Sequence, residues 1–155
     1  MKRLNYINRL RTTFGFGVHS AFAYDFIMNV LREKNHYYAY DVIDTLPIPP
    51  KTARMLFRTR LFFSGANFYA IPDDSSLNKI VSIAEKESKT GVSAIKFGED
   101  TEIIFLLLGR KKANNLILQE QLRNMTFGMA FINHRKHAII VKDRNLPRKD
   151  YELFF

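Results

Sequence analysis

The run Ile103-Ile104-Phe105-Leu106-Leu107-Leu108 constrains the fold more than any other part of the chain. In a β-strand these apolar side chains would point to both faces of the sheet. Such a strand belongs inside a sheet whose two faces are both covered, as in parallel α/β sheets. The run is also far too short for a membrane-spanning helix, which needs about 20 residues. We therefore predict a central strand over Glu102–Leu108.

Helical spacing, capping residues and turn signals predict the elements around this strand. Ser20 is the predicted N-cap of one helix, and Asp74 or Ser75 is the predicted N-cap of another. The order of elements predicts an α/β three-layer fold with an antiparallel edge, and Thr126–Ile132 should pair with Ala138–Val141 as a hairpin. The predicted helices cover residues 1–13, 20–33, 52–63, 75–88 and 110–122, and the predicted strands cover 67–71, 92–97, 102–108, 126–132, 138–141 and 151–155.

The length of 155 residues predicts one domain. We expect a basic N-terminal helical part over 1–63 and a sheet-containing part over 64–155. The chain has no cysteine, which excludes disulfides, thiol nucleophiles and cysteine-based zinc sites and fits a cytoplasmic protein. The basic start is followed by no continuous apolar stretch, so we expect neither a signal peptide nor a membrane partner.

The net charge of +9 is distributed unevenly along the chain. Residues 1–60 carry +6, residues 61–109 carry −3, and residues 110–155 carry +6. The two basic ends would form one positive face if the termini meet, and such a face binds nucleic acid or another polyanion without a sequence motif. A simply solvated surface is the competing interpretation. The candidate polyanion-binding residues are Arg54, Arg58, Arg60, Arg110, Lys111 and Lys112.

Two segments resemble a known family. Residues 14–25 read Phe-Gly-Phe-Gly-Val-His-Ser-Ala-Phe-Ala-Tyr-Asp, and residues 125–131 read Met-Thr-Phe-Gly-Met-Ala-Phe, followed by a hairpin, by 146–151 and by a terminal Phe154-Phe155. They resemble segments of bacterial S-adenosylmethionine-dependent methyltransferase-like proteins, which are common in Bacteroides and its relatives. The first matches their Gly-Val-His-Ser-Pro-Phe motif, with Ala21 in place of proline. The resemblance implies a small Rossmann-like sheet that ends in an antiparallel hairpin, here in a shortened form.

The resemblance also implies where S-adenosylmethionine would bind. The family holds this cofactor with a glycine-rich turn after a strand, but the turn here, residues 72–76, reads Pro-Asp-Asp-Ser-Ser. Glu99 and Asp100 follow the predicted strand 92–97, where the related enzymes place the acid that holds the ribose hydroxyls. If the cofactor binds, the candidate residues are therefore Asp73, Asp74, Glu99 and Asp100. A pocket beside the 72–76 turn, open enough for adenosine, would favour an enzyme.

We therefore expect a degenerate methyltransferase-like protein that binds no cofactor and acts as a binding or interaction module. The alternatives are an active S-adenosylmethionine-dependent methyltransferase with an atypical cofactor loop and a basic nucleic-acid-associated protein. No residue pattern identifies a catalytic group. His134 and His137 are three residues apart at a predicted hairpin tip, which favours a solvated turn over a metal site. An incomplete sheet could leave an edge open for a homodimer.

Overall fold

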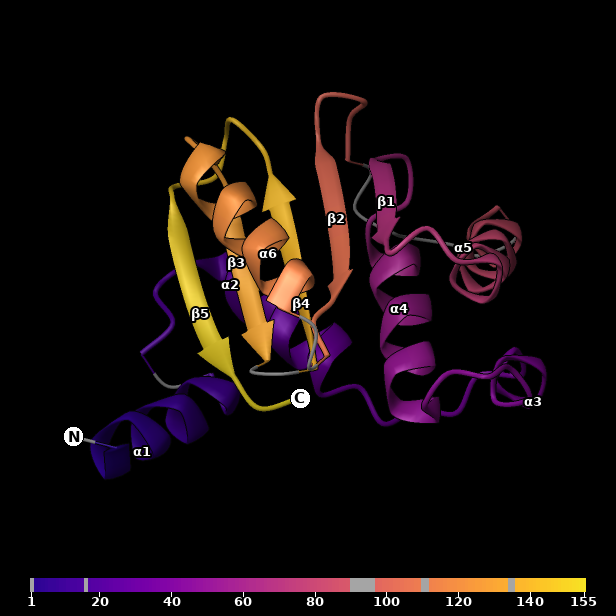
Figure 1. The fold of residues 1–155 in the computed structure, drawn as a ribbon, viewed down its shortest axis with the longest axis horizontal. Helices are drawn as coiled ribbons and strands as arrows, with labels where there is room; N and C mark the ends of the chain where they lie inside the picture. The colour runs from indigo at the N-terminus through magenta and orange to yellow at the C-terminus, as the bar shows by residue number, and fades with distance from the viewer. Residues whose placement is uncertain (1, 16, 90–96, 110–111, 134–135) are drawn as a thin grey trace.

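The computed structural model describes residues 2–15, 17–89, 97–109, 112–133 and 136–155. It contains helices and five strands in an α/β arrangement, as the sequence predicts (Figure 1). The helices are α1 (Lys2–Thr13), α2 (Ala21–Phe26), the π-helical segment η1 (Ile27–Leu31), α3 (Tyr40–Ile43), α4 (Pro50–Phe62), α5 (Ser75–Ser88) and α6 (Lys112–Asn124). The strands are β1 (Asn67–Ile71), β2 (Glu102–Leu107), β3 (Met129–Asn133), β4 (His137–Lys142) and β5 (Lys149–Leu153).

The strands form one mixed sheet in the order β1-β2-β4-β3-β5. β1 pairs parallel with β2, and β3 pairs parallel with β5. β4 lies between β2 and β3 and is antiparallel to both, with Ile139 opposite Phe105 on one side and Phe131 on the other. The predicted hairpin is therefore confirmed. The predicted strand Glu102–Leu108 is also confirmed as an interior strand, with one parallel and one antiparallel neighbour.

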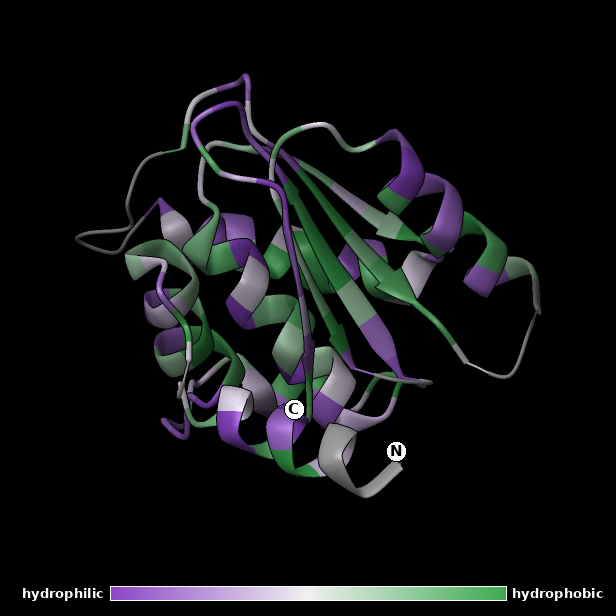
Figure 2. Cartoon of the chain, turned by 90° about the vertical axis from the view of Figure 1, so that its left-hand side faces the viewer, coloured by the Kyte–Doolittle hydropathy of each residue, from purple (hydrophilic) through white to green (hydrophobic). Residues whose placement is uncertain are grey.

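Helices cover both faces of this sheet and explain why β2 is apolar on both sides (Figures 1 and 2). Ile103 and Phe105 face a larger core formed with α2, η1, α3, α4 and α5. Ile104 and Leu106 face a smaller core under α6. Each core takes alternate residues of the strand, because successive side chains point to opposite faces. The three-layer arrangement follows directly from this alternation.

Phenylalanine side chains fill the larger core. The Phe26 ring lies between two layers, with its centroid 4.6 Å from that of Phe131 in the sheet and 5.3 Å from that of Phe63 after α4. All three side chains are fully buried. Burying one such side chain contributes about 1.5–3 kcal/mol, and the ring carries no polar atom that needs a partner. This core explains the heavy use of phenylalanine.

The opposite layer is thin, because α6 is the helix that covers it. Within residues 113–124 no side chain is fully buried, and Leu116 is 64% exposed. Ile117, Leu118 and Leu122 are half-buried against the smaller core. The helix predicted over 110–122 is observed over Lys112–Asn124, and residues 110 and 111 lie outside the described residues. α6 is therefore held by partial burial and by hydrogen bonds from Asn114 to the Leu107 carbonyl of β2 (2.7 Å) and from Arg148 to the Leu122 carbonyl (2.9 Å).

Several elements differ from the sequence prediction. The helix that begins after Ser20 widens into a π-helical turn over η1. α4 begins two residues earlier than predicted, at Pro50, because a proline at the first helical position needs no backbone N–H partner. The final strand ends two residues earlier than predicted. The strand predicted over 92–97 falls on 92–96, which lie outside the described residues, and on Phe97, which is not in a strand.

Among the described residues, no helix is both long enough and apolar enough to cross a membrane. The edge strands of the described sheet are β1 and β5. α1 packs against β5, so the N-terminal helix lies beside the C-terminal strand (Figure 1). The predicted dimerisation through an open edge stays a prediction.

Candidate functional site

The turn between β1 and α5 is the first place to look for a ligand site. In open α/β sheets, ligands bind outside the carboxyl ends of the parallel strands, often at the N-terminus of the following helix. Here the carboxylate of Asp74 accepts hydrogen bonds from the backbone N–H groups of Ser76 (2.8 Å) and Leu77 (3.3 Å). The predicted N-cap is confirmed. The chain's own carboxylate thus occupies the position where a ligand anion would bind.

A second carboxylate lies in the same turn. Asp73 accepts a hydrogen bond of 2.6 Å from the side-chain amide of Asn78, one turn into α5. Asp73 and Asp74 are both exposed, so water solvates their negative charge. The turn is therefore fixed by these three hydrogen bonds and is negatively charged.

Glu99 and Asp100 lie at the opposite end of the sheet from this turn. They precede β2, and the carbonyl of Glu99 accepts a hydrogen bond of 2.7 Å from the Asn67 side chain at the start of β1. Because β1 and β2 are parallel, their starts lie together, whereas Asp73 and Asp74 follow the end of β1. A strand of this length spans about 16 Å. The four acids proposed for cofactor binding therefore form two separate pairs and not one site.

An open cavity of about 700 Å³ runs along β1 on the side of α6. Asp73 and Ile71 line it near the turn, and Glu102 lines it near the start of β2. Tyr69, which is 52% exposed, lies between them. The volume falls in the range of small-molecule sites. This cavity is the feature that the sequence analysis named as favouring an enzyme.

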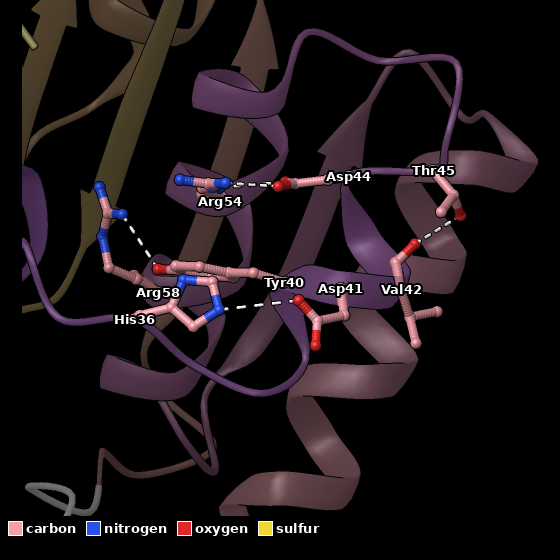
Figure 3. A network of polar contacts seen from close by, with 8 residues as sticks. All are labelled: His36, Tyr40, Asp41, Val42, Asp44, Thr45, Arg54 and Arg58. Atoms are coloured by element: carbon pink, nitrogen blue, oxygen red, sulfur yellow. Dashed lines mark hydrogen bonds and ion pairs between the residues drawn. The ribbon is translucent and has the colours of Figure 1, made fainter.

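Two of the candidate polyanion-binding arginines belong to a network around Tyr40 (Figure 3). Arg54 forms an ion pair with Asp44, and its guanidinium lies 4.8 Å from the centre of the Tyr40 ring. The hydrogen bond from Arg54 holds the pKa of the Asp44 carboxyl below its usual value. Arg58 donates to the Tyr40 hydroxyl (3.1 Å) and to the carbonyl of Val30 in η1 (2.8 Å). The two arginines together hold α3 against α4, and Arg58 also holds η1.

The remaining candidate cations are divided between the two faces of the sheet. Arg60 donates to Glu85 of α5 (3.0 Å) and to the carbonyl of Phe63 (2.8 Å), with only 11% of its side chain exposed. Lys112 begins α6, on the opposite face of the sheet from α4. Arg110 and Lys111 lie outside the described residues. The described candidates are thus spread over two faces, and polyanion binding stays a prediction.

The two segments that carry the family resemblance meet inside the molecule. Ser20 caps α2 by accepting from the N–H of Ala23 (3.3 Å), and its hydroxyl also approaches the Met129 sulfur at 4.0 Å. Gly128 has a φ of +123°, and a Cβ there would collide with the carbonyl of Val141. His19 is exposed. In this fold Ser20 and Gly128 therefore have structural roles.

His137 is the residue that the sequence analysis placed wrongly. It begins β4, is only 3% exposed, and stacks on Phe105 with ring centroids 5.5 Å apart. Burial lowers its pKa to about 4, and within the described residues neither ring nitrogen has a hydrogen-bond partner. Extending the alternation of β4 back from Ile139 would have placed it on the buried face. His134 lies outside the described residues, and the described part of the chain contains no cluster of potential metal ligands.

Comparison with known proteins finds no matching family model, no similar curated protein and no similar solved structure.

Proposed function

We propose that this chain is a methyltransferase-like domain that binds no S-adenosylmethionine and acts as a binding module. The observation that carries the proposal is the hydrogen bonding of Asp74 to Ser76 and Leu77 at the start of α5. A nucleotide-type cofactor needs free amides and open space at such a helix start. Here the amides have an intramolecular partner, and a side chain occupies the space.

A cofactor carboxylate placed at this turn would meet two unfavourable effects. Displacing Asp74 from the helix start would cost about 1 kcal/mol, the typical contribution of an N-cap. The incoming anion would also lie close to the carboxylates of Asp73 and Asp74, and like charges repel most strongly where water is excluded. The glycines that normally give room at this position are missing.

The positions of the two acids predicted to hold the ribose also argue against cofactor binding. Glu99 and Asp100 lie about one strand length from the turn, at the other end of β1 and β2. One cofactor in the usual orientation could not contact both pairs of acids.

A thermal-shift titration with S-adenosylmethionine and S-adenosylhomocysteine tests the proposal. We expect no shift at concentrations up to about 1 mM. A ligand at one hundred times its dissociation constant stabilises a protein by about 2.7 kcal/mol, which is easily measured. A saturable shift that Glu99→Ala or Asp100→Ala removes and Glu120→Ala on α6 retains would contradict the proposal.

The second candidate function is an active methyltransferase with an atypical cofactor loop. The cavity along β1 favours it, because Asp73 and the exposed Tyr69 ring line a volume large enough for adenosine. In that arrangement the cofactor would lie beside β1 and not at the start of α5. The same titration distinguishes this case, because Tyr69→Ala would then remove the shift and Asp100→Ala would not.

We also propose a cytoplasmic location for the protein, which the absence of cysteine supports.

A further inference from the structure

One side of α1 exposes a row of large apolar side chains. Tyr6 is 56% exposed, Ile7 52%, Leu10 39% and Phe14 47%. The backbone N–H of Phe14 still donates to the carbonyl of Leu10 (3.3 Å), so the helical spacing continues to Phe14. Side chains three and four residues apart share one face of a helix. These four residues therefore form one exposed stripe.

The adjoining side of α1 is fixed to the end of β5, where the Tyr6 ring also contacts the Phe154 ring, with centroids 5.2 Å apart. The Arg9 guanidinium lies 4.2 Å from the centre of the Phe154 ring, and the Thr13 hydroxyl accepts a hydrogen bond of 2.9 Å from the Phe154 N–H. Arg9 also donates to the carbonyl of Leu153 (3.4 Å). These contacts set the rotation of the helix about its axis. Ile7, Leu10 and Phe14 stay exposed beside this contact, on a helix at one end of the molecule (Figure 1).

Positive charge accompanies the stripe. The segment Lys2–Thr13 contains four basic residues and no acidic residue, and the first acidic residue of the chain is Asp25. Arg11 is exposed. The Arg32 guanidinium lies 4.2 Å from the centre of the Phe14 ring, which places a further positive charge at the Phe14 end of the stripe. We call Tyr6, Ile7, Leu10, Arg11 and Phe14 the α1 face.

We propose that the α1 face binds an anionic lipid surface, with α1 lying along the membrane plane. This proposal rests on the proposed function as a binding module and names its partner. A helix of this length is about 18 Å long, too short to span a bilayer but long enough to lie in the interface. Tyrosine and phenylalanine suit that position, because interfacial side chains combine an apolar ring with nearby polar groups.

The charges favour lipid over a second copy of the chain. Two copies joined through the α1 face would bring Arg11 of one helix close to Arg11 of the other, and Glu152, which lies beside α1, already pairs with Arg9 on the β5 side (3.7 Å). One side of a single helix is also convex, and a lipid surface can deform around it without a preformed groove. Exposure of Ile7 and Leu10 is the structural reason for departing from the sequence-based expectation of no membrane partner.

Vesicle flotation tests this proposal with the full chain. We expect binding to phosphatidylcholine vesicles containing about 30% phosphatidylglycerol, no binding to pure phosphatidylcholine, and loss of binding in about 0.5 M salt. The Arg11→Ser variant should bind about fivefold more weakly, which corresponds to about 1 kcal/mol per basic residue at an anionic surface. Ile7→Ser/Leu10→Ser should abolish binding.

Matched variants control for general effects of charge and polarity. Leu116→Ser on α6 removes a leucine that is more exposed than Leu10 (64% against 39%), and Lys79→Ser on α5 removes an exposed cation. Both should bind like the wild type. All of these positions are exposed, and circular dichroism would verify that each variant is folded.

Three results would overturn the proposal. They are no flotation with anionic vesicles, equal loss of binding in Leu116→Ser and Leu10→Ser, and a dimer in solution that Ile7→Ser/Leu10→Ser dissociates. The last result would assign the α1 face to contact between copies of the chain. None of them affects the cofactor titration, so failure of this proposal is distinguishable from failure of the proposed function.

Discussion

The His137 ring stacks on Phe105, with ring centroids 5.5 Å apart and ring planes inclined by 14°. Phe155 contacts the same imidazole edge-on at 4.8 Å. Both ring nitrogens are buried, and within the described residues neither has a hydrogen-bond partner. A buried polar group without a partner costs about 1–3 kcal/mol. Replacing His137 with an apolar ring of similar size should therefore stabilise the fold.

This environment predicts a pH dependence of stability. Burial lowers the pKa of His137 from 6.5 to about 4, so folded His137 stays neutral while unfolded His137 takes up a proton. The free energy of unfolding should fall as the pH drops from about 6.5 to about 4, by about 3 kcal/mol at 1.4 kcal/mol per pKa unit. Above pH 6.5 this residue contributes no pH dependence.

Urea denaturation of the wild type and His137→Phe at several pH values measures the effect. Phenylalanine keeps an aromatic ring between Phe105 and Phe155 and removes the two nitrogens. The variant should be more stable at pH 7, by about 1 kcal/mol, and its advantage should grow as the pH falls. A constant difference between the two proteins from pH 7 to pH 4.5 would disprove this assignment.

Asp74→Ala should destabilise the protein by about 1 kcal/mol, because it removes the cap of Ser76 and Leu77 at the start of α5. Asp73→Ala is the matched control. Its hydrogen bond to Asn78 is exposed, so the expected loss is within about 0.5 kcal/mol. Chemical denaturation monitored by circular dichroism would compare them, and equal losses would show that Asp74 is not the cap.

Arg58→Lys should cost about 2 kcal/mol, because a lysine cannot donate to both the Tyr40 hydroxyl and the Val30 carbonyl in the geometry of a guanidinium. Arg123→Lys on the exposed side of α6 is the control and should be neutral. The midpoint of urea unfolding would report both. Wild-type stability of Arg58→Lys would mean that Arg58 does not hold η1 to α4.

Gly128→Ala should destabilise the fold by more than about 3 kcal/mol, because the added Cβ would collide with the Val141 carbonyl and lie 2.9 Å from the Lys142 Cα. Gly17 also has a positive φ, of +75°, but its surroundings are open. Gly17→Ala should therefore cost only about 1 kcal/mol, the strain of the left-handed conformation. Similar thermal midpoints for the two variants would be incompatible with this packing.

Local signals in the sequence predicted the elements whose ends depend on nearby residues. Ser20 and Asp74 cap helices where expected, and β1 has the predicted bounds Asn67–Ile71. The apolarity of residues 103–108 correctly required a sheet covered on both sides. Each of these features is set by the chemistry of a few neighbouring side chains.

Features that depend on distant pairings could not be predicted in this way. The insertion of β4 between β2 and β3 comes from long-range backbone pairing. The separation of Asp73 from Glu99 by the length of β1 depends on that strand running parallel to β2. The internal partners of Arg58 come from η1 and α3, and α3 itself was not predicted. For the same reason, burial of the Arg60 side chain could not be deduced from an exposed-looking helix pattern.

We propose that the β1–α5 turn and its surroundings hold no S-adenosylmethionine. Isothermal titration calorimetry with S-adenosylhomocysteine measures this directly, because it needs neither a methyl acceptor nor a change in melting temperature. We predict no saturable heat up to about 1 mM ligand, a level at which even a micromolar site would be saturated. Saturable one-to-one binding that is abolished by Tyr69→Glu, in the cavity beside the turn, would contradict the claim and establish a cofactor-binding protein.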